Sequence, residues 1–91
     1  MLYAVLCLDK DGTSDLRAAT RPAHLEYLEK FRPRIAISGP LLKEDQSTPK
    51  GSLLILEFAD YGEARAFADN DPYAQAGLFS SVSITPFRKV F

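Results

Sequence analysis

The order of its apolar and amphipathic segments most constrains how this chain can fold. Four segments have the length and apolar character of β-strands: Leu2–Leu8, Ile35–Leu42, Ser52–Ala59 and Phe79 to about Arg88. Segments with helical periodicity separate the first strand from the second and the third from the fourth. The predicted order is β-α-β-β-α-β, the split βαβ arrangement of ferredoxin-like α+β domains. It predicts an antiparallel four-stranded sheet with both helices on one face.

Capping residues and a proline set the expected limits of the first helix. Ser14 or Asp15 can cap a helix that runs to about Arg32. Pro22 fits poorly in a helix interior, because it lacks the N–H that the helix needs. A second interpretation therefore starts or restarts the helix near Thr20, with the proline in its first turn.

The second half of the chain contains a polar loop and another helical segment. Glu44–Gly51 is polar and predicts a hairpin loop between the second and third strands. Tyr61 to about Asn70 is rich in alanine and amphipathic, which predicts the second helix. Asp71-Pro72-Tyr73 ends that helix and opens a further short turn of helix or a loop.

Composition limits the class of protein. Ninety-one residues predict a single domain, 1–91, because cores are seldom divided at this length. A net charge of −1 gives no basic field, which argues against a nucleic-acid partner. No apolar run approaches the roughly 20 residues that cross a membrane, and the N-terminus lacks the basic segment of a signal peptide. The single cysteine, Cys7, has no partner for an internal disulfide, so we expect a cytoplasmic protein.

Two of the predicted strands are apolar on both faces, which a sheet with one solvated face would not show. In the first strand, Leu2, Ala4, Leu6 and Leu8 alternate with Tyr3, Val5 and Cys7. Two helices cover only one face, and the last residues, Lys89–Phe91, are too few to cover the other. Because monomers rarely expose so much apolar surface, we expect a homodimer through the uncovered sheet face, in the form of a dimeric α+β barrel.

The only histidine, His24, lies in the middle of the apolar face of the first helix, within about 40° of Leu28 and Phe31. The apolar face of the second helix continues, at the same spacing, to Asp71. An imidazole and a carboxylate are thus both expected to point inward. Asp71 could then hold His24 in one tautomer, leaving the other ring nitrogen free to exchange a proton with a substrate.

Each member of this pair also has a purely structural interpretation. His24 could be a core histidine that bonds to a backbone carbonyl. Asp71 precedes Pro72, a combination typical of a helix N-cap followed by the first helical residue. Capping and pairing are compatible, because a carboxylate has several lone pairs.

Ser38, Gly39 and Tyr73 are candidates for substrate binding. Glycine inside a strand pattern marks either a bulge or a close backbone approach to a ligand, for which Ser38 would be a hydrogen-bond donor. Tyr73 would line a pocket, although aromatic residues at such positions more often belong to the core. Arg17 and Arg21 could meet an anionic substrate, but we interpret them as solvated helix charges.

The chain lacks the usual signatures of metal and cofactor sites. One histidine and one cysteine give no zinc spacing. No glycine-rich phosphate loop or dinucleotide fingerprint is present. We therefore predict no metal and no cofactor, and a function in proton transfer, elimination, isomerisation or simple binding of a small molecule.

Several segments resemble the YCII-related family of small dimeric α+β barrel proteins. They are Met1–Val5, Arg21–Leu25, Ser38–Pro40, Phe67–Tyr73 and a last strand that ends near Pro86-Phe87. The resemblance implies a ferredoxin-like fold, a dimer and an active site built on His24 and Asp71, with Ser38 and Gly39 beside the pocket. The fold is shared with muconolactone isomerases and cofactor-independent monooxygenases. A member of the family dehydrochlorinates chlorinated hydroquinones.

Three functions follow as hypotheses. The first is a cofactor-free lyase or isomerase in which His24 and Asp71 perform acid–base chemistry on a small, aromatic or hydroxylated molecule. The second is a dimeric binding or accessory domain that holds a metabolite without changing it. The third is a cofactor-independent monooxygenase of the same fold.

Overall fold

The computed structural model describes residues 1–91 and has the expected element order. The main elements are β1 (Leu2–Asp9), α1 (Ser14–Glu29), β2 (Ile35–Leu42), β3 (Pro49–Glu57), α2 (Tyr61–Asn70) and β4 (Phe79–Phe87). Two short helices are added: a 3-10 helix at Arg32–Arg34 and α3 at Pro72–Gln75. The predicted α+β, ferredoxin-like fold is confirmed.

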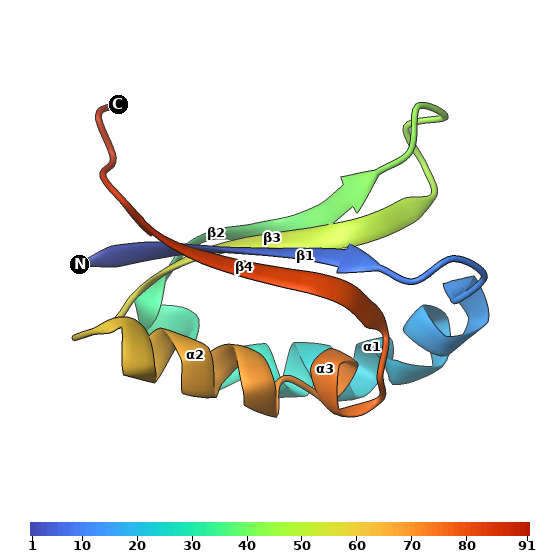
Figure 1. The fold of residues 1–91 in the computed structure, drawn as a ribbon, viewed down its shortest axis with the longest axis horizontal. Helices are drawn as coiled ribbons and strands as arrows, with labels where there is room; N and C mark the ends of the chain where they lie inside the picture. The colour runs from blue at the N-terminus through green and yellow to red at the C-terminus, as the bar shows by residue number, and fades with distance from the viewer.

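The four strands form one antiparallel sheet in the order β2-β3-β1-β4. Val5 of β1 lies opposite Leu54 of β3 and Ile84 of β4, so the two central strands carry the apolar middle of the sheet. All helices lie on one face of this sheet, and no element covers the other face (Figure 1).

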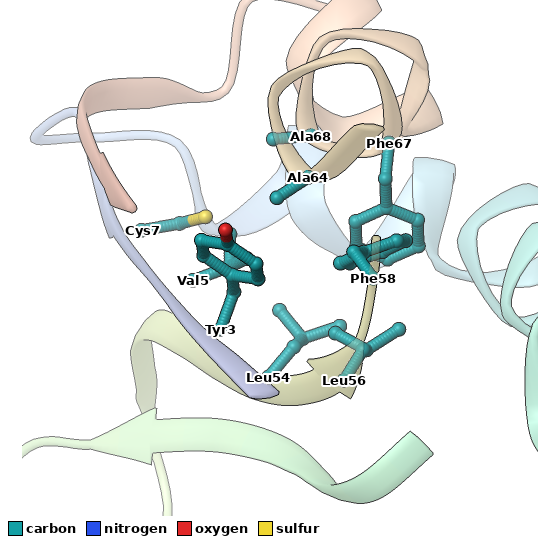
Figure 2. Packing of buried hydrophobic residues seen from close by; sticks show 9 residues of the cluster. All are labelled: Tyr3, Val5, Cys7, Leu54, Leu56, Phe58, Ala64, Phe67 and Ala68. Carbon is teal, nitrogen blue, oxygen red and sulfur yellow. The ribbon is translucent and has the colours of Figure 1, made fainter. Parts of the chain in front are cut away.

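The core lies between the sheet and α2. Alternate residues of β1, namely Tyr3, Val5 and Cys7, point toward the helices and are buried. Figure 2 shows Ala64 and Ala68 of α2 directed at these side chains. Because alanine is small, the helix packs close to the sheet. This packing holds the C-terminal end of α2, where Asp71 follows.

The proline inside the first helix does not interrupt it. Helix α1 is continuous from Ser14 to Glu29 and contains Pro22, so the predicted restart near Thr20 is wrong. A proline in this position deprives only the Ala18 carbonyl of its usual i+4 donor, and tertiary packing of the apolar face maintains the helix around it.

The limits of helix α1 and strand β3 also differ from the prediction. Helix α1 ends at Glu29 rather than near Arg32, and Arg32–Arg34 forms a separate 3-10 helix with Pro33 in it. Strand β3 begins at Pro49 rather than Ser52, since Pro49 still pairs with Leu42 of β2.

The hairpin turn between β2 and β3 is shorter than predicted and is organised by one carboxylate. Asp45 accepts hydrogen bonds from the backbone N–H groups of Ser47 and Thr48, each at 2.9 Å, and from the Thr48 hydroxyl. These bonds lower the pKa of Asp45 to about 2. The turn brings Thr48 beside the cavity described below.

The sheet face away from the helices is apolar along β1, whereas β4 contributes Ser81, Ser83 and Thr85 to it. Leu6, Leu8 and Ile37 on this face are 38%, 40% and 60% exposed. They alternate along their strands with residues that face the helices, as the two-sided apolar pattern predicts. None of the helices is both long and apolar enough to cross a membrane.

Candidate active site

His24 and Asp71 come from different helical segments and meet in the interior. His24 extends from the middle of α1, and Asp71 follows the last residue of α2. The two side chains are only 9% and 4% exposed, and His24 Nδ1 lies 2.8 Å from Asp71 Oδ1. The pairing predicted from the two helix faces is therefore present in the structure.

The Asp71 carboxylate has a second partner in the backbone that follows it. Its Oδ1 accepts a hydrogen bond from the backbone N–H of Tyr73 at 2.9 Å and caps α3. An ionised carboxylate has no hydrogen to donate, so in the bond between His24 and Asp71 the hydrogen lies on Nδ1. Both interpretations of Asp71, as a cap and as the partner of His24, are correct.

The imidazole ring is held on one face and open at one nitrogen. It stacks on Tyr73, with 4.0 Å between ring centroids and 19° between planes. Its Nε2 makes no hydrogen bond within the chain. Because no buried polar side-chain atom of the chain lacks a partner, Nε2 must be partly exposed. Some exposure of this nitrogen is a requirement for proton exchange with a ligand.

A cavity of about 540 Å³ adjoins the histidine, between α1, the β2–β3 hairpin and the sheet. His24, Ser38, Gly39 and Tyr73 all line it, so four of the five predicted site residues come together. Asp71 does not line the cavity; it lies behind the imidazole, in contact with Nδ1. His24 therefore lies between the Asp71 carboxylate and the cavity.

Arg17 is a site residue that the sequence interpretation missed. It is 7% exposed, and its Nε and Nη2 donate to the two carboxylate oxygens of Asp9 at 2.7 and 3.2 Å. Nη2 also donates to Ser52 Oγ at 2.8 Å, and the guanidinium carbon lies 4.6 Å from the centre of the Tyr73 ring. The interpretation as a solvated helix charge is wrong for Arg17.

The burial of this arginine has a simple cause. Its seven-residue distance from His24 places it within about 20° of the same helix face, and that spacing was the signal available in the sequence. The free-energy cost of burying the charge is offset because Asp9, at the end of β1, forms a bidentate ion pair with the guanidinium group.

Two other ionisable groups near the site stay neutral at ordinary pH. Burial raises the pKa of Tyr73, although the charges of Arg17 and Arg21 act in the opposite direction. Burial, reinforced by the negative charges of Asp71 and Asp9, raises the pKa of the Cys7 thiol to about 12. Tyr73 is thus available as a hydrogen-bond donor, and Cys7 packs as a small apolar residue.

No group of three or more histidine, cysteine, aspartate or glutamate side chains gathers anywhere in residues 1–91. The side chains that line the cavity are the His24 imidazole, hydroxyls, arginines and apolar groups.

Comparison with known proteins places this chain in a family. The YCII-related domain matches residues 1–88. Protein YciI of Escherichia coli O6:H1 is 39% identical over 98 aligned positions that cover both chains completely. A Haemophilus influenzae protein described as uncharacterized is 33% identical over the same extent.

Two solved structures have related folds. One is the 5-chloro-2-hydroxyhydroquinone dehydrochlorinase TftG from Burkholderia phenoliruptrix, in complex with 2,5-dihydroxybenzoquinone. It has a TM-score of 0.90 and 33% identity, and the match covers 97% of this chain and 94% of that one. The other is a candidate antibiotic biosynthesis monooxygenase from Nitrosomonas europaea, with a TM-score of 0.55, 14% identity and coverage of 99% and 98%, which indicates a shared fold alone.

Proposed function

The chain belongs to the YCII-related domain family, and we propose that it is a cofactor-free enzyme of the lyase or isomerase type. In this proposal His24 and Asp71 move a proton on a small, hydroxylated aromatic molecule that binds in the cavity. The observation that carries it is the 2.8 Å contact between His24 Nδ1 and Asp71 Oδ1 at the wall of that cavity.

The proposed chemistry uses the two ring nitrogens differently. With its hydrogen on Nδ1 and directed at Asp71, the neutral imidazole presents the lone pair of Nε2 to the substrate. Nε2 takes a proton, and the electron pair left behind either expels a leaving group or shifts along a conjugated system. The Asp71 carboxylate stabilises the imidazolium formed in this step. The imidazolium then returns the proton to the product or to solvent.

The substrate class is supported by the shape of the cavity and by one relative. A volume of about 540 Å³ accommodates a single aromatic ring, and Leu25, Leu28 and Leu54 supply apolar walls. The dehydrochlorinase with a TM-score of 0.90 was solved with 2,5-dihydroxybenzoquinone, a small hydroxylated ring compound. By analogy we propose a substrate of that kind here.

Release of chloride from 5-chloro-2-hydroxyhydroquinone tests the proposal directly, because an elimination removes one proton and one chloride ion. In the His24→Gln variant kcat/KM should fall by a factor of about 10²–10⁴, the usual contribution of a general acid or base. Glu26→Gln, on an exposed position of α1, is the matched control and should retain activity.

Exchange of substrate hydrogen with D₂O, followed by NMR, extends the test to hydroxylated aromatics without a leaving group. Exchange that requires His24 supports proton transfer. A compound that binds but is neither exchanged nor converted by the native chain supports the binding-domain hypothesis instead. Undiminished turnover in folded His24→Gln contradicts the proposal.

A further inference from the structure

The charged side chains that line the cavity all have the same sign. Arg17 and Arg21 line it together with His24, whereas no aspartate or glutamate does. The whole chain contains 12 acidic residues and has a net charge of −1. The positive lining therefore does not follow from the overall charge, and it is a property of this cavity.

The two arginines differ in how far their charge is neutralised. Both carboxylate oxygens of Asp9 pair with Arg17. Arg21 is exposed and forms no ion pair with any carboxylate of the chain. Arg21 is thus the uncompensated positive charge at this cavity.

Two hydroxyl groups lie close to the arginines. Ser52 Oγ accepts the bond from Arg17 Nη2, and the Ser52 hydroxyl hydrogen has no acceptor within the chain. The Tyr73 hydroxyl also donates to no group of the chain, and Arg17 and Arg21 are near enough for their charges to oppose the rise in its pKa that burial causes. A positive charge and two hydroxyl groups thus line the same cavity, and such groups together recognise an oxyanion.

We propose that the ligand of this site is a small organic anion, and that Arg21 determines this specificity. The charged oxygen binds to Arg21, Ser52 and Tyr73, which all line the cavity. A planar apolar body lies against Leu25 and Leu28. This inference rests on the proposed function, because it concerns the same cavity, and it adds the charge of the substrate.

The test compares anions with neutral compounds of the same shape. Benzoate and benzamide probe a carboxylate, and 4-nitrophenolate and nitrobenzene probe an ionised phenol. Each is titrated into the full chain and followed by the NMR signals of the His24 ring and the Ser52 amide. At least one anion should bind tighter than its neutral counterpart by about tenfold or more, the factor expected of one hydrogen bond to a charged group.

The variants identify the residue responsible. Arg21→Gln should abolish the preference for the anion, and Arg21→Lys should restore most of it by keeping the charge. Arg88→Gln removes an arginine that does not line the cavity and should leave the preference unchanged. The inference is overturned if neither anion is preferred at concentrations up to about 10 mM, or if Arg21→Gln retains the preference.

Failure of this inference differs from failure of the proposed function. An anion preference that depends on Arg21, in a chain whose turnover does not need His24, would leave the inference intact and refute the acid–base proposal. Turnover that needs His24, without any preference for anions, would refute the inference alone.

Discussion

One oxygen of Asp71 serves two groups, the ring of His24 and the backbone N–H of Tyr73. The capping bond holds the carboxylate in place at the start of α3, and the same atom then orients the imidazole. Local backbone structure and the geometry of the site are therefore coupled through a single side chain.

Two substitutions separate these roles. Asp71→Asn keeps an acceptor for the Tyr73 N–H but removes the negative charge that stabilises the imidazolium. We expect kcat to fall at least about 100-fold with a loss in the free energy of unfolding below about 1 kcal/mol. Asp71→Ala removes both hydrogen bonds and should cost about 2–4 kcal/mol. Activity assays together with urea unfolding measure the two effects, and full activity in Asp71→Asn would contradict the assignment.

Cys7 gives a prediction about pH. In the folded chain burial raises the pKa of its thiol from 9.0 to about 12, so the unfolded chain releases this proton first as the pH rises. The contribution to stability is complete below the unfolded pKa and is lost between it and the folded pKa. From about pH 8 to about pH 10.5 the free energy of unfolding should fall by about 2 kcal/mol more in the native chain than in Cys7→Ala.

Urea unfolding of the native chain and of Cys7→Ala at the two pH values isolates the thiol, because the tyrosines titrate in both. Equal losses in the two chains would show that Cys7 ionises as readily in the folded chain as in the unfolded one.

At the scale of elements, the spacing of β1 and β3 depends on a glycine. A Cβ atom at Gly51 would lie 2.3 Å from the backbone oxygen of Cys7, which is closer than real Cβ contacts allow. A side chain there would push the two central strands apart. Because Ser52 is the next residue, this displacement would also move its hydroxyl away from Arg17.

We expect Gly51→Ala to lower the free energy of unfolding by about 1–3 kcal/mol, the usual cost of overpacking. Gly39→Ala is the matched control, since a Cβ at Gly39 would meet nothing within 4 Å. It should change stability by no more than about 0.5 kcal/mol. Chemical unfolding measures both variants, and equal effects would mean that β1 and β3 can separate without cost.

At the scale of the whole molecule, the helices leave one sheet face bare (Figure 1). Leu6 is near the middle of that face and is 38% exposed, opposite Leu53 of β3. At roughly 25 cal/mol per Å², several hundred Å² of such surface would contribute several kcal/mol to association. The expectation of a homodimer through this face stays a prediction.

Leu6→Lys places a charge in the middle of the expected interface and should convert a dimer into a monomer, because a buried unpaired charge is costly. Leu16→Lys is the matched control: Leu16 is 36% exposed but lies on α1, away from the bare face, so this variant should remain dimeric. Sedimentation measures both masses. A monomeric native chain, or a dimeric Leu6→Lys variant, contradicts the prediction.

Hydrophobic periodicity predicted most of the helices and strands, because it shows which side of a helix or strand each residue occupies. The alternation of Tyr3, Val5 and Cys7 with the other apolar residues of β1 divided that strand between two sheet faces, and the structure showed which of them the helices cover. The helical spacing around His24 identified the inward face of α1. The alternative in which the helix restarts near Pro22 was wrong for a physical reason. The free-energy cost of a proline in a helix is local, whereas the packing that outweighs it comes from the rest of the fold.

The sequence by itself determined the order of elements, the two faces of the sheet and the inward direction of His24 and Asp71. Only the tertiary structure decided that Arg17 is buried, because its neutralisation requires Asp9 from the end of β1 and a hydroxyl from β3. The physical reason is the separation along the sequence of the residues that matter. The direction of a side chain follows from a few neighbouring residues, whereas the stability of a buried charge depends on partners that are distant along the chain.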